Sequence, residues 1–233
     1  MVSQSLIFII VAVTFLNIVA LCFSRKPQTV ITTSMSTAVI TSLCGLLGAG
    51  ILLAGGKPLV LTLTYLSPFG ELRLVSDNLG HFFMLITALV WFPVSIFSFS
   101  YLHKYAGRYD LRLFGALYNL LFLALIFTVL SGDMVGFLIS WEIAAIISYL
   151  LVNFKYEKPL VTRAGLVMIV MGEVGTVLMM AAFVLLYNYT GHLDFAGIRA
   201  FAGTLPAGVK NAVFFLALAG FGIKAGLVPL QQL

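Results

Sequence analysis

The sequence predicts an all-α integral membrane protein with about seven transmembrane helices, the seventh of them broken. Two observations lead to this fold class. Hydrophobic residues make up 61% of the 233 residues and charged residues only 9%, whereas soluble domains carry about 25% charged residues. The apolar residues also fall into seven runs of roughly 20, the length that a helix needs to cross a bilayer core.

The predicted spans are separated by short polar segments, and we expect no soluble domain. Their approximate ranges are 4–23, 33–54, 80–101, 113–131, 134–153, 164–188 and 211–230. The first run lacks a basic start and a small-residue cleavage site, so we interpret it as a retained span and not a signal peptide. Alternating residues around a Ser-Pro-Phe-Gly turn predict a short external hairpin before the third span. We divide the chain into residues 1–112, with spans one to three, and residues 113–233, with spans four to seven.

Lysine and arginine residues are distributed unevenly between the two sides of the predicted bundle. If the N-terminus is outside, eight lie on one side (Arg25, Lys26, Lys104, Arg108, Arg112, Lys155, Lys158 and Arg163) and four on the other (Lys57, Arg73, Arg199 and Lys210). The side richer in basic residues is usually cytoplasmic. We therefore predict an inner-membrane protein with an external N-terminus and a cytoplasmic C-terminus.

Three ionisable residues remain inside predicted spans: Glu142, Glu173 and Lys224. A charge at the bilayer centre costs roughly 3 kcal/mol, and such residues usually face the bundle interior or a hydrated cavity. Each also has a simpler interpretation. Glu142 could be hydrogen-bonded for packing alone, Glu173 could be a buried protonated acid, and Lys224 could snorkel to a span end about 9 Å away along the helix.

The surroundings of Lys224 predict a break in the seventh span. Gly220, Gly222 and Gly226 allow close approach of other backbones, and Pro229 removes an amide donor. Interrupted helices at membrane depth mark ion sites in transporters.

An acid on one helix and an amine on another form a pair that can exchange protons. Together, the two charges lower each other's cost in the membrane, and moving them apart drives a proton off the amine. The sequence therefore predicts a proton-transfer site composed of Glu142, Glu173 and Lys224.

Other chemistry has no motif in this sequence. Cys22 and Cys44 are not spaced for metal or redox work, and His81, His103 and His192 lie at span ends or in loops. Phosphate-binding glycine motifs are missing, and so is a nucleophile–base–orienter set. We expect no cofactor in this chain, no active site of its own and no nucleic-acid partner.

Two stretches of the sequence resemble a known family. They are "SGDMVGFLISWEIAAIISYLL" at 131–151 and "LALAGFGIKAGLVPL" at 216–230. Both are similar to the antiporter-like membrane subunits of respiratory complex I, group 4 membrane-bound hydrogenases and multisubunit cation/proton antiporters, above all to the hydrogenase-4/formate hydrogenlyase type. The Trp-Glu pair at 141–142 and the G-x-K-x-G-x-x-P pattern at 222–229 are the most specific signals.

The resemblance implies a fold of about fourteen spans with two inverted five-helix repeats, each containing a broken helix. This chain would form its N-terminal half, with residues 113–233 as an incomplete first repeat. The resemblance also implies that Glu142 and Lys224 form the input pair of a proton pathway, and that partner subunits carry nickel–iron and iron–sulfur centres. The function expected is that of a proton-translocating membrane subunit of a complex I-like redox complex. The alternatives are a subunit of a sodium or potassium/proton antiporter, and an inert membrane anchor or assembly fragment.

The sequence departs from the family pattern in three places. Glu173 stands where hydrogenase-4-type relatives often have a histidine, Gln231 replaces a histidine after the broken helix, and the chain ends at Leu233 without an eighth span. We expect either a truncated product or a separate chain that supplies the missing helices. The other partners expected are the lipid bilayer and the membrane and peripheral subunits of a redox complex.

Overall fold

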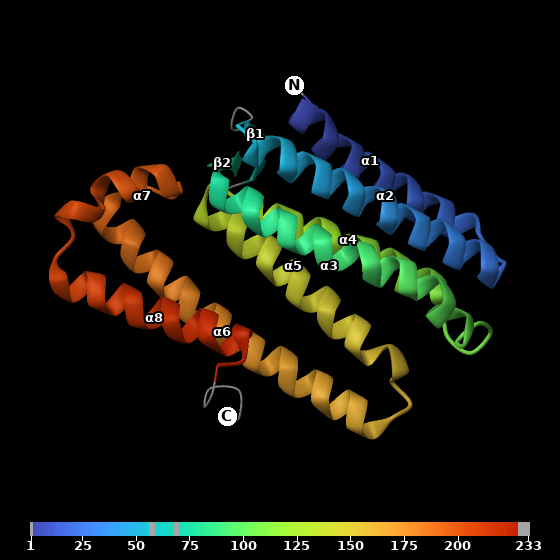
Figure 1. Cartoon of the computed structure of the whole chain (residues 1–233). Coiled ribbons are helices and arrows are strands. Elements are labelled where there is room, and N and C mark those ends of the chain that lie inside the picture. Colours follow the sequence, from blue (N-terminus) through green and yellow to red (C-terminus); the bar gives the residue numbers. More distant parts are fainter. Residues whose placement is uncertain (1, 56–58, 68–69, 228–233) are drawn as a thin grey trace. The chain divides into compact units, whose positions relative to one another are not determined.

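Seven long apolar helices dominate the computed structural model, which describes residues 2–55, 59–67 and 70–227 (Figure 1). Each is long and apolar enough to cross a membrane. They are α1 (Val2–Phe23), α2 (Pro27–Leu53), α3 (Asn78–His103), α4 (Leu111–Leu130), α5 (Met134–Val152), α6 (Pro159–Thr190) and α8 (Ala207–Ala225). The predicted all-α multi-pass membrane fold with seven spans is confirmed.

Short elements connect some of the long helices. Strands β1 (Leu59–Ser67) and β2 (Gly70–Ser76) pair as a two-stranded sheet in the segment where a hairpin is predicted. The short helix α7 (Phe195–Phe201) lies between α6 and α8. Two 3₁₀ turns, Asn153–Lys155 and Ala202–Thr204, follow α5 and α7.

The chain forms two compact units that are interleaved in sequence. The first unit comprises Met1–Leu61 and Leu74–Leu130, and the second comprises Thr62–Arg73 and Ser131–Leu233. Helix α4 belongs to the first unit, whereas the division predicted at residue 112 follows the repeat of the resembled family. The predicted division marks the start of a sequence repeat and not the edge of a compact unit, so it stays a prediction.

In the first unit, α2 contacts α1, α3 and α4. Buried apolar side chains fill the space between these helices: Ile7, Ile10, Ala49, Met84, Ala88, Phe122, Ile126 and Leu130. A polar contact joins α2 and α4, because the Asn119 amide donates to the backbone oxygens of Ser34, at 3.1 Å, and of Gly115, at 2.9 Å. Buried amide contacts of this kind hold helices together where lipid offers no competing partner.

In the second unit, α6 contacts α5, α7 and α8. It begins at Pro159, where a proline costs no intrahelical hydrogen bond, and it ends at Gly191, whose φ of +71° suits a residue without a Cβ. The 32-residue helix is therefore longer than the predicted span at 164–188, because the helix continues past its apolar run to these two stop signals.

Helix α8 ends earlier than predicted. The seventh span is expected at 211–230, whereas α8 covers Ala207–Ala225 and closes with Gly226 in a left-handed conformation, φ +71°. The amides of Gly226 and Leu227 donate to the oxygens of Ile223 and Gly222, at 3.2 and 2.9 Å. The helix thus ends inside the run where a break is predicted. Pro229 lies outside the described residues.

Candidate functional site

The second unit brings Glu142 of α5 and Lys224 of α8 together. Lys224 Nζ lies 3.7 Å from Glu142 Oε1, and the two side chains are 17% and 26% exposed. Both residues belong to helices that can span a membrane. A charge inside a membrane-spanning helix needs a partner of opposite charge. Glu142 and Lys224 are such partners for each other.

Two glycine contacts between α6 and α8 set the position of Lys224. A Cβ atom on Gly220 of α8 would lie 2.8 Å from the carbonyl oxygen of Gly175 of α6 and 2.6 Å from Met179 Cγ. Only glycine permits this close backbone approach. One turn earlier on α6, Gly172 lies beside the lysine stem, where a Cβ would make an ordinary van der Waals contact with Lys224 Cε at 3.5 Å.

The end of α8 also favours a cation at Lys224. The residue lies in the last turn, and Gly222, which is buried, accepts a capping hydrogen bond. Unpaired carbonyl groups give the C-terminal end of a helix a partial negative charge. Helix end and carboxylate therefore attract the same ammonium group.

Thr176 of α6 holds the carboxylate of Glu142. Its hydroxyl donates a hydrogen bond to Glu142 Oε1 and also lies 3.2 Å from the carbonyl oxygen of Gly172. The Thr176 residue is only 4% exposed. A hydroxyl has one proton and two lone pairs, so Thr176 can donate to an ionised Glu142, or accept from a protonated one while it donates to Gly172.

Glu173 of α6 completes the charged cluster. Its carboxyl interacts electrostatically with both Glu142 and Lys224. The side chain is exposed on the surface of the unit. Two ionised carboxylates repel each other, so a proton on either acid favours keeping them together, and each of the three side chains of this cluster can carry a proton.

Trp141 covers the other side of the ammonium group. Lys224 Nζ lies 4.8 Å from the centroid of the Trp141 ring, within the range of a cation–π interaction. The indole itself packs edge-on against Phe221 of α8 and stacks on Phe137 of α5, with centroids 5.6 and 5.4 Å apart. Aromatic contacts therefore fix one wall of the site.

Comparison with known proteins bears on this cluster. The family described as "NADH:quinone oxidoreductase/Mrp antiporter, TM" matches residues 131–232, which contain Glu142, Glu173 and Lys224. Hydrogenase-4 component B of Escherichia coli is 28% identical over 229 residues, which are 98% of this chain and 34% of that protein. An uncharacterized protein of Mycobacterium tuberculosis is 36% identical over 196 residues, 83% of this chain and 29% of its own length.

Residues 131–232 of the chain belong to the antiporter-like membrane subunit family.

A solved structure agrees with this assignment at the level of the fold. The structure of the membrane-bound sulfane sulfur reductase, an archaeal respiratory membrane complex, superimposes with a TM-score of 0.81 at 22% identity. The match covers 99% of this chain and 46% of that one. The chain spans about a third of the length of the two relatives from Escherichia coli and Mycobacterium tuberculosis.

The structure brings together the three ionisable residues predicted from the sequence, and it adds Trp141 and Thr176 as their partners. The sequence marks Trp141 as part of the Trp-Glu pair of the family resemblance, but neither residue carries a charge that would assign it to the site. The position of Thr176, three residues after Glu173 on the same helical face, is the signal that links it to the cluster. Among the predicted helix-breaking residues, Gly220, Gly222 and Gly226 are placed at the packed end of α8.

A second polar cluster of the antiporter-like subunit lies where α5 and α7 begin. Asp133, 3% exposed, caps α5 by accepting from the amide of Gly136 at 2.7 Å, and it accepts from the amide of Arg73 at 2.8 Å. Asp194 caps α7 through the amide of Gly197 at 2.9 Å. The sequence pattern Asp-x-x-Gly, which recurs at both helix starts, could have predicted these caps.

Charges around Asp194 strengthen this cluster. Arg73 Nη1 and His192 Nδ1 each lie 3.6 Å from the Asp194 carboxylate. The hydrogen bond from Gly197 and the charge of Arg73 lower the pKa of Asp194 below its ordinary value, against the opposing effect of burial. Asp194 is therefore ionised at neutral pH and holds β2 against the start of α7.

In the described part of the chain, histidine, cysteine, aspartate and glutamate residues form no group of three or more that could hold a metal ion. His81 is buried in the first unit, whereas the three residues of the charged cluster belong to the second.

Proposed function

We propose that this chain is part of a proton-translocating membrane subunit of a complex I-like redox complex of the hydrogenase-4/formate hydrogenlyase type. The single observation that carries the proposal is the ion pair between Glu142 and Lys224, 3.7 Å apart on two candidate transmembrane helices. Similarity to hydrogenase-4 component B over nearly the whole chain supports the type of complex.

Proton transfer would follow from a change in the distance between the two charges. While Lys224 contacts Glu142, the ammonium and the carboxylate stabilise each other. If the last turn of α8 moves away from α5, each charge is left in an apolar region, where the neutral forms are favoured. A proton then leaves the Lys224 ammonium for a neighbouring acceptor, and the carboxylate of Glu142 takes up a proton from another donor.

The neighbours of the pair would serve both of its protonation states. Thr176 can donate to the ionised form of Glu142 and accept from the protonated form. Glu173 would act as a further proton donor and acceptor for Glu142, because the two carboxyl groups interact electrostatically. Trp141 would stabilise the ammonium when the carboxylate is neutral.

The setting of the subunit is also part of the proposal. We propose a cell inner (cytoplasmic) membrane, with the N-terminus outside and the C-terminus in the cytoplasm, from the distribution of basic residues. Further helices complete the proton path, since the relatives are longer than this chain. Other membrane subunits and peripheral subunits bind it, and the latter carry the nickel–iron and iron–sulfur centres.

Replacement of Lys224 by alanine in the intact complex tests the function. Proton uptake or release per turnover should be lost in Lys224→Ala, while the redox reaction of the partner subunits is partly retained. Lys210→Ala is the matched control, because Lys210 is an exposed lysine of the same helix that contacts only the Gly203 carbonyl oxygen in the described structure. Normal proton movement in Lys224→Ala would rule out a pumping role for this residue and favour an inert anchor.

A subunit of a sodium or potassium/proton antiporter is the second candidate. The description of the matching family, which includes the Mrp antiporter, favours it, and the acid–amine pair would serve this exchange equally well. Vesicles containing the complex separate the two functions. A pH change that requires added sodium or potassium, and no redox substrate, would identify the antiporter.

A further inference from the structure

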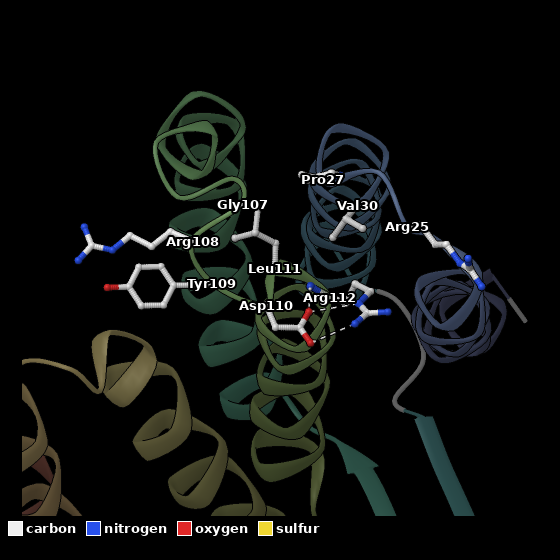
Figure 2. A pocket seen from close by; sticks show the side chains of 9 residues that line it. All are labelled: Arg25, Pro27, Val30, Gly107, Arg108, Tyr109, Asp110, Leu111 and Arg112. Carbon is white, nitrogen blue, oxygen red and sulfur yellow. Dashed lines mark hydrogen bonds and ion pairs between the residues drawn. The ribbon is translucent and has the colours of Figure 1, made fainter.

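A cavity of about 460 Å³ lies in the first unit at the ends of four transmembrane helices (Figure 2). Its lining residues come from the α1–α2 and α3–α4 connections and from the first turns of α2 and α4. Helices α1 and α3 end just before these connections, and α2 and α4 begin just after them. The cavity therefore lies at the depth of the membrane surface, where lipid headgroups lie.

The charge of the cavity is predominantly positive. Three arginines, Arg25, Arg108 and Arg112, line it together with one acid, Asp110. Asp110 is already engaged, since it accepts from Arg112 Nε at 3.3 Å and from the Arg112 backbone amide at 2.9 Å. Contact with Arg112 lowers the pKa of Asp110, although burial opposes the change, so this acid is ionised and neutralises one arginine only.

The arginines occupy different sides of the cavity. Figure 2 shows Arg112 beside Asp110 at the start of α4, with Arg25 on the side of α1 and Arg108 extending to the opposite side. Helix α2 begins at Pro27, which also lines the cavity, and no side chain caps it. The start of a helix carries a partial positive charge from its unpaired amides, which adds to the field of the two guanidinium groups.

From this arrangement, we propose that Arg25, Arg112 and the start of α2 bind the phosphate group of an anionic phospholipid. Arginine matches phosphate because its planar fork can donate two parallel hydrogen bonds. The apolar surface continues next to the cavity along α1, where Phe23 is 82% exposed, and this surface suits an acyl chain. The basic side of the bundle is also the side predicted to face the cytoplasm, whose leaflet carries anionic lipids.

The site is separate from the proton-transfer cluster, since its residues belong to the other compact unit. A phosphate in this cavity could instead come from solution. The two sources share the same chemistry at the arginines and differ in whether the acyl chains contribute, so the experiment compares them directly.

Thermal unfolding of the detergent-purified chain tests the proposal. Phosphatidylglycerol should raise the melting temperature of the wild type, whereas phosphatidylcholine should have little effect because its choline group cancels the charge. Arg25→Gln with Arg112→Gln should weaken the apparent affinity for phosphatidylglycerol about tenfold or more, the loss expected when a charged hydrogen bond is removed. Arg163→Gln is the control, because Arg163 is an exposed basic residue of the second unit on the same predicted side.

Three outcomes decide the proposal. Equal stabilisation of the double variant and the wild type would overturn it, and so would equal effects of phosphatidylcholine and phosphatidylglycerol. Inorganic phosphate that stabilises the wild type as strongly as the lipid would overturn the lipid as the ligand and leave a soluble anion in its place. Arg25→Gln alone answers the question if the double variant does not fold, since Arg25 takes no part in the Asp110 contact.

Discussion

Thr176 holds one hydroxyl proton within reach of two acceptors, the carboxylate of Glu142 and the carbonyl oxygen of Gly172. This residue is the element of the site that can adapt to either protonation state of Glu142 without any movement of a helix. A carboxyl group that changes its charge in an apolar region needs such a partner, because an unpaired polar group there costs several kcal/mol.

Replacing Thr176 by valine should therefore slow proton movement. The change keeps the shape of the side chain but removes a hydrogen bond to a charged group, which contributes about 1.5–3 kcal/mol. We expect the rate of proton translocation by the complex to fall about tenfold or more. Thr176→Ser keeps the hydroxyl and should retain most of the rate; equal loss in both variants would indicate a packing role.

Single residues of the site were predictable from the sequence when they broke the apolar pattern. Glu142, Glu173 and Lys224 stand out because an ionisable group is costly inside a span. The contacts of Thr176 and Trp141 with the charged residues were not predicted, since they come from the packing of α5, α6 and α8 against one another. Their contacts depend on the rotation of each helix, which hydropathy does not determine.

At the scale of elements, the contact between α6 and α8 determines where Lys224 lies. Gly175 and Gly220 face each other there, and no other residue fits at Gly220 without displacing Met179 or the opposite backbone. Any side chain at this point would push the end of α8 away from α6.

Gly220→Ala should destabilise the second unit by about 1–3 kcal/mol, the usual cost of an added methyl group in a packed contact. Gly208→Ala in the same helix is the matched control. A Cβ there meets no atom within 4 Å, and alanine favours helix by about 1 kcal/mol over glycine. Thermal unfolding in detergent measures both, and a Gly220→Ala variant as stable as Gly208→Ala would contradict the close contact.

The start of α7 should depend on pH through Asp194. The pKa of Asp194 is lowered in the folded protein, so its contribution to stability is present above the unfolded value of about 3.9 and is lost as the pH falls below it. The basic side chains that face the carboxylate are Arg73 and His192.

Asp194→Asn isolates this charge, because asparagine also caps helices but carries no charge to attract Arg73. We expect the variant to unfold at a lower temperature than the wild type at pH 7. The difference should shrink as the pH is lowered from about 5 towards 2. A difference that stays constant over this range would show that the carboxylate does not act through its charge.

The elements themselves were largely predictable, and their ends less so. All seven spans exist because each apolar run is long enough to cross a membrane. The ends differ since helices continue through polar residues to the next stop signal, as α6 does between Pro159 and Gly191. Helix α8 shows the reverse, because Gly226 adopts a left-handed conformation and ends the helix before the apolar run ends.

At the scale of the whole molecule, the distribution of basic residues predicts the orientation of the chain in the membrane. Eight lysine and arginine residues against four favour a cytoplasmic location for the first group. The family and the number of spans agree with this pattern but do not determine which side faces the cytoplasm.

Reporter fusions at the two ends of the chain measure this orientation. Alkaline phosphatase, which is active only outside the cytoplasm, should be active when fused to the N-terminus and inactive when fused to the C-terminus. A reporter that is active only in the cytoplasm should give the opposite result. Cytoplasmic activity at the N-terminus would overturn the prediction.

The interleaving of the two units in sequence has a consequence for biosynthesis. Residues 62–73 leave the ribosome before Asp133, whose carboxylate accepts a hydrogen bond from the amide of Arg73, 60 residues earlier in the sequence. During translation this part of the β1–β2 segment cannot reach Asp133 until α3 and α4 have been synthesised. A polypeptide that starts at residue 131 would lack the segment altogether, so dissection of the protein between α4 and α5 should fail unless residues 62–73 are grafted onto the second fragment.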